Sequence, residues 1–99
     1  MGMFLDMSDM IGNYEERLIG NDKVNGFEVD TVRVTDTGYY AETAIRHPEL
    51  DDGYWIIVQE YETHEQAEKA HERWVDMLEN EKINTIVCVQ TGRTYHIRW

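Results

Sequence analysis

The chain has 99 residues, of which 41% are hydrophobic and 11% aromatic, and its formal net charge is −11. This length predicts one folded domain, and the three Trp and six Tyr residues exclude a disordered chain. The acidic charge repels phosphate backbones, so direct nucleic-acid binding is not expected. A single cysteine, Cys88, excludes an internal disulfide and favours a reducing compartment, so we expect a cytoplasmic protein.

The charges are unevenly distributed along the sequence. Residues 1–81 carry all 20 acidic and six of the nine basic residues, whereas residues 82–99 carry Lys82, Arg93 and Arg98 and no acidic residue. The basic C-terminal segment is therefore a candidate anion site. No apolar run approaches the roughly 20 residues of a membrane span, and the N-terminal segment lacks the basic region that begins a signal peptide. We therefore expect no membrane association.

The first half of the chain predicts a short helical turn followed by β-strands. Residues 3–12 place their apolar side chains roughly on one side of a helical turn. Residues 14–20 are a candidate strand, residues 21–26 a turn, and residues 27–36 a strand rich in β-branched side chains. Alternation in the next segment, 39–47, predicts a strand whose shared face is made of Tyr39, Ala41, Thr43 and Ile45.

The second half predicts an apolar strand, a long helix and a terminal hairpin. Residues 54–61 are the most apolar stretch, and we expect this strand at the centre of the sheet. A helix begins after Thr63, because Thr63 as N-cap and Gln66 three residues later make a capping box. The last two strands are expected in residues 84–90 and 94–99.

These elements predict an α+β fold in a single domain over residues 1–99. An antiparallel β-sheet of about four to six strands carries one long helix packed across one face, with a C-terminal β-hairpin. One helix cannot cover a sheet of that size completely. A second copy of the chain is the simplest cover, so we expect a homodimer.

The helix carries a pattern of histidine and glutamate that invites a metal-site interpretation. His64-Glu65 lacks the second histidine of an H-E-x-x-H zinc site, and His71 lies about 10 Å along the helix from His64, too far to share one zinc ion. Glu68 and His71 match part of a di-iron ligand set, whose other ligands come from further helices. We therefore expect no metal and no cofactor. His71 lies in the apolar stripe, where a hydrogen-bonded core histidine is the simpler interpretation.

The C-terminal hairpin carries the clearest candidate binding residues. Its basic side chains alternate with aromatic and aliphatic ones, and cations beside aromatic rings hold anionic, stackable ligands such as nucleotides. The alternative is a strand with one face in the core and its basic side chains in solvent. With two residues of the helix added, the candidate ligand-binding residues are His71, Trp74, Arg93, His96 and Arg98.

The remaining polar groups favour structural interpretations. His47-Pro48, beside three acidic residues, is interpreted as a solvated turn, with a rim site as the alternative. Cys88 lies in an apolar stretch without a basic neighbour and is expected to be inert. The chain has no nucleophile elbow, glycine-rich phosphate loop or Cys-x-x-Cys motif, so no catalytic residue is assigned.

Four stretches carry a resemblance: VDTVRVTDT, YYAETAIRHPE, DGYWIIVQEY and AEKAHERWV. With them, residues 13–78 resemble small uncharacterised proteins encoded in bacteriophage and prophage genomes. The residues after 82 do not contribute. The resemblance implies a phage origin and a small α+β domain, and it brings no activity and no catalytic residues.

Two functional hypotheses follow. The first is a non-enzymatic interaction protein whose acidic surface complements a protein partner with a basic surface and speeds association at low salt. The second is a domain or enzyme that binds a nucleotide or another small anion in a pocket between sheet and helix or at a dimer interface. Because no catalytic set is recognisable, the first hypothesis is favoured.

Overall fold

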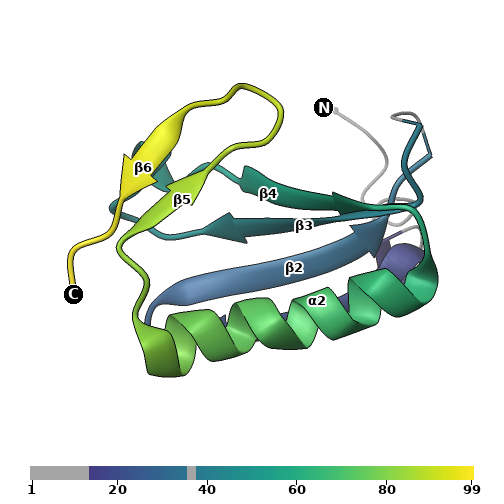
Figure 1. Ribbon diagram of the computed structural model, residues 1–99, viewed down its shortest axis with the longest axis horizontal. Helices are drawn as coiled ribbons and strands as arrows, with labels where there is room; N and C mark the ends of the chain where they lie inside the picture. The colour runs from purple at the N-terminus through teal and green to yellow at the C-terminus, as the bar shows by residue number, and fades with distance from the viewer. Residues whose placement is uncertain (1–13, 36–37) are drawn as a thin grey trace.

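The computed structural model describes residues 14–35 and 38–99 and confirms the predicted α+β fold. Helix α2 (His64–Asp76) lies across one face of a four-stranded antiparallel sheet and continues as the π-helical segment η2 (Met77–Glu81) (Figure 1). A C-terminal hairpin forms a second, two-stranded sheet. In sheet order the strands are β1 (Leu18–Val24), β2 (Phe27–Arg33), β3 (Ala41–Arg46) and β4 (Ile56–Tyr61), followed by β5 (Thr85–Val87) and β6 (Thr94–His96) in the hairpin.

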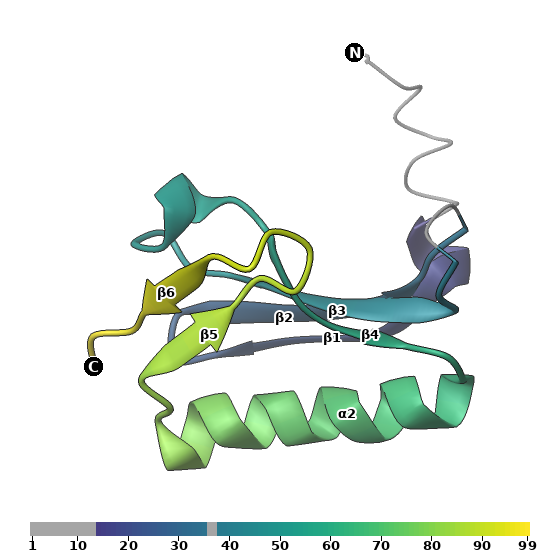
Figure 2. The same cartoon turned by 45° about the horizontal axis from the view of Figure 1, so that its top comes forward.

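The helix-facing side of the sheet holds the hydrophobic core. Figure 2 shows α2 running along this side, while the loop that contains the short helix η1 (Asp51–Gly53) stands on the other side. The hairpin adjoins the free edge of β4, where the Val89 N–H donates to the Ile57 carbonyl at 2.8 Å. The main core joins sheet, η2 and hairpin, and its members are Phe27, Val29, Ile45, Leu50, Ile56, Val58, Leu78, Ile86, Cys88 and Ile97.

The helix begins as predicted. Thr63 Oγ1 accepts the Gln66 backbone N–H at 3.1 Å, and Gln66 Oε1 accepts the Thr63 N–H at 3.3 Å, which completes the capping box. At the other end, the Asn25 side chain of the β1–β2 turn donates to the Leu78 carbonyl at 3.1 Å. This contact fixes the end of the helix to the turn at one end of the sheet.

Two strand predictions are wrong. β4 lies at an edge of the four-stranded sheet and not at its centre. Its apolar sequence has another cause, because α2 and the hairpin cover its core-facing side chains while Trp55, just before the strand, is exposed. β1 starts later than predicted and runs through the expected turn to Val24, because the tight turn is made by Asn25-Gly26 with positive φ at both residues. Residues 14–17 are helical.

Two further predictions concern parts of the chain that are less fully described. The expected helical turn at residues 3–12 lies outside the described residues, and so does the last residue of the strand expected over 27–36. Ala41, Thr43 and Ile45 form the buried face of β3 as predicted, whereas Tyr39 precedes the strand and is exposed.

In residues 14–35 and 38–99, no helix has the length and apolar character needed to cross a membrane.

Candidate functional site

His71 is buried between α2 and the sheet and uses both ring nitrogens. Its Nδ1 lies 2.7 Å from Thr31 Oγ1, and its Nε2 lies 2.7 Å from Asp22 Oδ2. Gly20 supplies the space, since a Cβ there would lie 2.7 Å from ring atoms of His71. Gly20 pairs directly with Thr31 across β1 and β2, so the register of these strands builds the socket.

The hydrogen bonds of His71 continue across the sheet to β4. Thr31 Oγ1 lies 2.6 Å from Thr43 Oγ1, which in turn lies 2.9 Å from the Tyr61 hydroxyl. On β4, Gln59 Oε1 accepts the Trp74 indole N–H at 2.9 Å. Every buried side-chain nitrogen or oxygen in the described part of the chain has a partner. We call Asp22, His71, Thr31, Thr43 and Tyr61 the buried polar row, in which Asp22 is the end that reaches the surface, with its side chain 54% exposed.

The buried polar row contains the groups of a catalytic triad in the same order, but its hydroxyl is not accessible to a substrate. A carboxylate, an imidazole and a hydroxyl follow one another in Asp22, His71 and Thr31, as in Ser-His-Asp enzymes. The Thr31 side chain, however, is fully buried, and its oxygen already contacts both His71 and Thr43. A substrate has no path to this hydroxyl. The arrangement therefore positions α2 on the sheet and gives a structural role to both ring nitrogens.

A second polar cluster lies on the sheet face opposite the helix. Tyr14 donates to Asp30, and the Asn21 amide donates to Asp30 Oδ1 at 2.8 Å. Asp30 is only 8% exposed, so these donors replace the water that it loses. Burial, together with the hydrogen bond to Asp30, raises the pKa of Tyr14 to about 12.

Beside this cluster, Glu28 forms an ion pair with Arg46. Glu28 Oε1 accepts from Arg46 Nη2 at 2.8 Å and from Nε at 3.0 Å, and the Arg46 guanidinium lies 4.4 Å from the centre of the Trp55 ring. Burial alone would raise the pKa of Glu28, but hydrogen bonds from Asn21 and Arg46 outweigh it and lower the pKa. Glu28 therefore stays ionised at neutral pH, and the pair adds no net charge to the surface.

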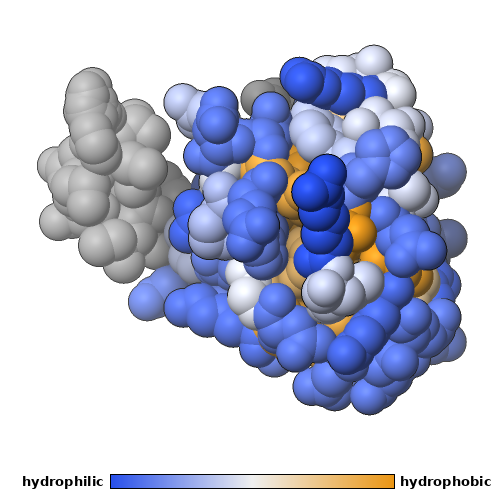
Figure 3. All heavy atoms as spheres, turned by 90° about the vertical axis from the view of Figure 1, so that its left-hand side faces the viewer, coloured by the Kyte–Doolittle hydropathy of each residue, from blue (hydrophilic) through white to orange (hydrophobic). Residues whose placement is uncertain are grey.

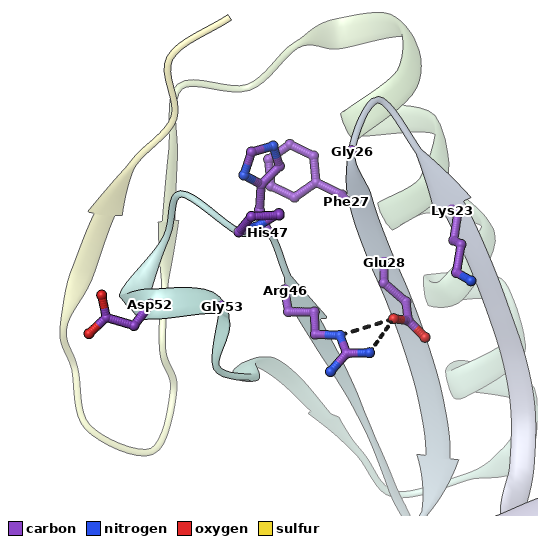
Figure 4. A pocket seen from close by; sticks show the side chains of 9 residues that line it. Lys23, Gly26, Phe27, Glu28, Arg46, His47, Asp52 and Gly53 are labelled. Atoms are coloured by element: carbon purple, nitrogen blue, oxygen red, sulfur yellow. Dashed lines mark hydrogen bonds and ion pairs between the residues drawn. The ribbon is translucent and has the colours of Figure 1, made fainter.

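Two adjoining surface hollows lie where the β1–β2 turn meets the loop of residues 47–54. The larger has a volume of about 500 Å³ (Figure 4) and the smaller about 330 Å³. Phe27 and His47 line both hollows, with ring centres 4.7 Å apart. Figure 3 views the molecule from the hairpin side, where hydrophobic side chains show between hydrophilic ones. The polar lining consists of Lys23, Glu28, Arg46 and Asp52 in the larger hollow and of Glu49, His96 and Arg98 in the smaller.

His47 has one engaged and one available ring nitrogen. Its Nδ1 accepts the Glu49 backbone N–H at 3.1 Å, so the neutral ring carries its proton on Nε2. No described residue accepts a hydrogen bond from Nε2. Nε2 lies beside Gly26, 2.9 Å from the position that a Cβ would occupy. Gly26 therefore has two reasons to be glycine, the contact with His47 and its own φ of +85°.

The structure distributes the five predicted ligand-binding residues over three places. His96 and Arg98 line the smaller hollow. The guanidinium of Arg93 lies 5.4 Å from the centre of the Tyr95 ring and 4.0 Å from an Asp51 carboxylate oxygen. His71 belongs to the buried polar row, Trp74 bonds to Gln59, and neither lines the hollows described.

Sequence reasoning missed Lys23 and Phe27 as lining residues of the hollows, and Phe27 as a neighbour of the C-terminal segment. Nothing local in the sequence places the β1–β2 turn beside residues 96–98. The nearest signal in the sequence is His47-Pro48, interpreted as a solvated turn with a rim site as the alternative, and His47 lines both hollows. The missing information was the packing of the hairpin against the sheet.

The lone cysteine and the acidic residues of the described ranges do not form a metal site. In the described residues, no group of three or more His, Cys, Asp and Glu side chains could hold a metal ion. Cys88 is buried as predicted. Burial raises the pKa of its thiol, but hydrogen bonds from Thr91 and from backbone groups outweigh burial and lower the pKa.

The exposed side of the helix carries a row of acidic side chains. Glu68, Glu72, Asp76 and Glu79 follow one another at helical spacing, and all four are exposed. The two cations of the helix are engaged elsewhere: Lys69 binds Glu65 at 2.9 Å, and Arg73 donates to Gln59 at 3.2 Å. We call the four acidic residues the acidic stripe.

No family model, curated protein or solved structure matches the chain significantly.

Proposed function

We propose that this chain is a non-enzymatic binding protein that contacts a basic surface of a protein partner through the acidic stripe. The observation that carries the proposal is the spacing of the stripe. Glu68, Glu72 and Asp76 are separated by four residues each, and each like-charge pair at this spacing destabilises an isolated helix by about 0.2–0.5 kcal/mol. Asp76 accepts the Asn80 amide at 2.7 Å, and Glu68 lies 3.6 Å from His64 Nε2. Glu72, between them, forms no ion pair with a described residue, and a basic partner would relieve the repulsion that remains.

The helix is also held rigidly, which suits a binding surface. The capping box fixes its first turn, the buried polar row fixes its middle, and Asn25 fixes its end. A surface that is ordered before binding loses little conformational entropy when the partner arrives. The net charge of −11 adds long-range attraction for a basic partner and speeds association at low salt.

A phage origin, a cytoplasmic location and a homodimer belong to the same proposal. The phage origin rests on the resemblance of residues 13–78. The location rests on the single cysteine and on the lack of an apolar span in the sequence. Direct binding to nucleic acid does not fit a surface of this charge.

The proposal can be tested with two variants of equal charge. In the stripe variant, Glu68→Gln, Glu72→Gln and Asp76→Asn remove three negative charges from the helix. In the control variant, Glu15→Gln, Glu16→Gln and Glu62→Gln remove three exposed charges elsewhere. The immobilised full chain and both variants would capture proteins from cells that encode this chain, at low salt. Captured proteins would then be purified and their affinities measured over a salt series.

We expect a basic protein that is held by the unchanged chain and by the control variant and is lost from the stripe variant. Its affinity for the stripe variant should fall by about tenfold or more, and the difference should shrink as salt screens the charges. If no captured protein distinguishes the stripe variant from the control variant, the acidic stripe is a solvated face and the proposal is wrong.

A further inference from the structure

We infer that the two adjoining hollows form one binding site for a small anion that carries a planar ring. The site lies at the hairpin end of the molecule and does not involve the acidic stripe. The hollows share Phe27 and His47, and each lies in the roughly 300–1,000 Å³ range of small-molecule pockets. A ligand could therefore place its ring against the His47 ring, which packs on the buried Phe27, and its charge among the surrounding donors.

The formal charges around the hollows balance, in contrast to the acidic remainder of the chain. The sequence has 20 acidic and nine basic residues, yet three bases and two histidines line the hollows against three acids. Glu28 and Arg46 neutralise each other, and Figure 4 shows the Glu28 carboxylate between Arg46 and Lys23. Asp52 points away from these residues, so an anion beside His47 would not be opposed by it.

Three donors around the hollows make no hydrogen bond and no ion pair with the described residues. They are the Lys23 ammonium, whose charge acts on the neighbouring Glu28, the Arg98 guanidinium and the His47 Nε2–H. Lysine, arginine and a histidine N–H are the groups that bind carboxylate and phosphate oxygens. The His47 donor is fixed in direction, because the Glu49 N–H holds the other ring nitrogen and Phe27 supports the ring.

The apolar part of the lining favours a flat ring. Phe27 is only 2% exposed, so the ring surfaces open to a ligand are those of His47 and Pro48, and Gly26 and Gly53 add backbone surface with few protruding atoms. Aromatic rings stack on such surfaces with about 0.5–1.5 kcal/mol beyond the burial of area. The combination of a flat apolar floor with cationic donors at its margin is the one that a nucleoside monophosphate uses.

The loop over the larger hollow is held in a strained conformation. Asp51, Asp52 and Gly53 all have positive φ, with values of 48°, 56° and 83°. For the two aspartates this conformation costs free energy, and such strain is concentrated at binding and catalytic sites. Contacts around the loop hold it in this conformation: Figure 4 shows the loop of residues 47–54 beside the hairpin, where Arg93 lies 4.0 Å from an Asp51 carboxylate oxygen.

The inference can be tested with AMP as the probe and inorganic phosphate and adenosine as its two halves. Isotope-labelled full chain would be titrated and followed by NMR at the Gly26 amide, the His47 ring and the Arg98 amide. We expect saturable shifts with AMP at these positions, and about tenfold or weaker binding of either half alone. Equal binding of phosphate and AMP would refute the requirement for a ring, and equal binding of adenosine and AMP the requirement for an anion.

Two variants of equal charge separate a specific site from general attraction. Lys23→Gln with Arg98→Gln removes the two unpaired cations of the hollows, and Lys69→Gln with Arg33→Gln removes two cations outside them. We expect the first pair to weaken AMP binding by about tenfold or more and the second pair to leave it within about twofold. Equal weakening in both pairs, or no saturable shift up to about 10 mM AMP, would overturn the inference.

Discussion

At the scale of single residues, the position of His71 depends on a residue that is far from it in sequence. A Cβ on Gly20 would lie 2.7 Å from His71 Cδ2 and Nε2, closer than such atoms approach without a shift. The backbone of Gly20 does not have a positive φ, so a larger residue there meets the imidazole and no backbone strain. Gly20 is thus fixed by packing alone.

We predict that Gly20→Ala destabilises the fold by about 1–3 kcal/mol, the usual cost of overpacking a core. In a chain that already carries His71→Ala, the same change should cost much less, because the ring is gone. Urea unfolding of the four variants measures this coupling. Equal costs in both backgrounds would mean that Gly20 does not act through His71.

Tyr14 gives a prediction about alkaline pH. Its folded-state pKa of about 12 is above the ordinary value of 10.0, so the neutral phenol is favoured in the folded state. Its contribution to stability is complete below pH 10 and is lost as the pH rises to about 12. Tyr14→Phe should therefore reduce the loss of stability over this interval, measured by urea unfolding at several pH values.

A matched control for Tyr14 is Tyr54→Phe, because the Tyr54 side chain is 70% exposed. This change should leave the pH dependence of unfolding as it is in the unchanged chain. Tyr61 and Tyr95 also have raised pKa values, mainly because of burial, so Tyr14→Phe should leave part of the dependence in place. Identical curves for the two variants would contradict the role assigned to Tyr14.

At the scale of elements, the sequence predicted features that depend on neighbouring residues and did not predict features that depend on contacts between distant segments. The helix start was predictable because Thr63 and Gln66 are three residues apart, and the capping box forms whatever surrounds it. The position of β4 was not predictable, because an edge strand covered by a helix and a hairpin has the same apolar sequence pattern as a central strand. His71 was predictable as a core histidine, but Asp22 and Thr31 come from strands 49 and 40 residues away.

The acidic stripe leads to a prediction that links helix stability to binding. Glu72 lies one turn from Glu68 and one turn from Asp76, so Glu72→Lys replaces two repulsions by two attractions. We expect this change to stabilise the chain by about 1 kcal/mol at low salt and to weaken binding of the basic partner. Thermal unfolding at low and high salt measures the first effect.

A control for this prediction is Glu72→Gln, which removes the repulsions and adds no attraction. It should give about half the stabilisation of Glu72→Lys, and the gain of both variants should shrink in high salt. A loss of stability in both variants would show that Glu72 makes a favourable interaction in the folded chain, contrary to the structure.

At the scale of the whole molecule, the two proposed binding surfaces differ in charge. The acidic stripe lies along the outward side of α2, while acids and bases are equal in number around the hollows. The sequence indicated a separation of charge, since residues 82–99 hold three bases and no acid. It could not indicate that Phe27 and His47 lie beside Arg98, because that depends on how the β1–β2 turn and the loop of residues 47–54 meet the hairpin.

The homodimer is a prediction for the whole molecule, and the structure changes the conditions under which we expect it. Helix and hairpin cover one face of the sheet, and the described part of the other face carries hydrogen-bonded polar groups such as Asp30 and Glu28. Two copies also bring together net charges of −11 each. Association should therefore be weak at low salt and strengthen as the screening length falls from about 10 Å at 0.1 M to about 3 Å at 1 M.

Sedimentation velocity over a series of salt and protein concentrations tests this expectation. The stripe variant, whose net charge is less negative by three, should dimerise at a lower salt concentration if repulsion between the copies is the limiting factor. The control variant has the same net charge and should behave identically if the dimer contact lies away from α2. A monomer at every salt and protein concentration would exclude the homodimer, and the binding surfaces would then act on a single chain.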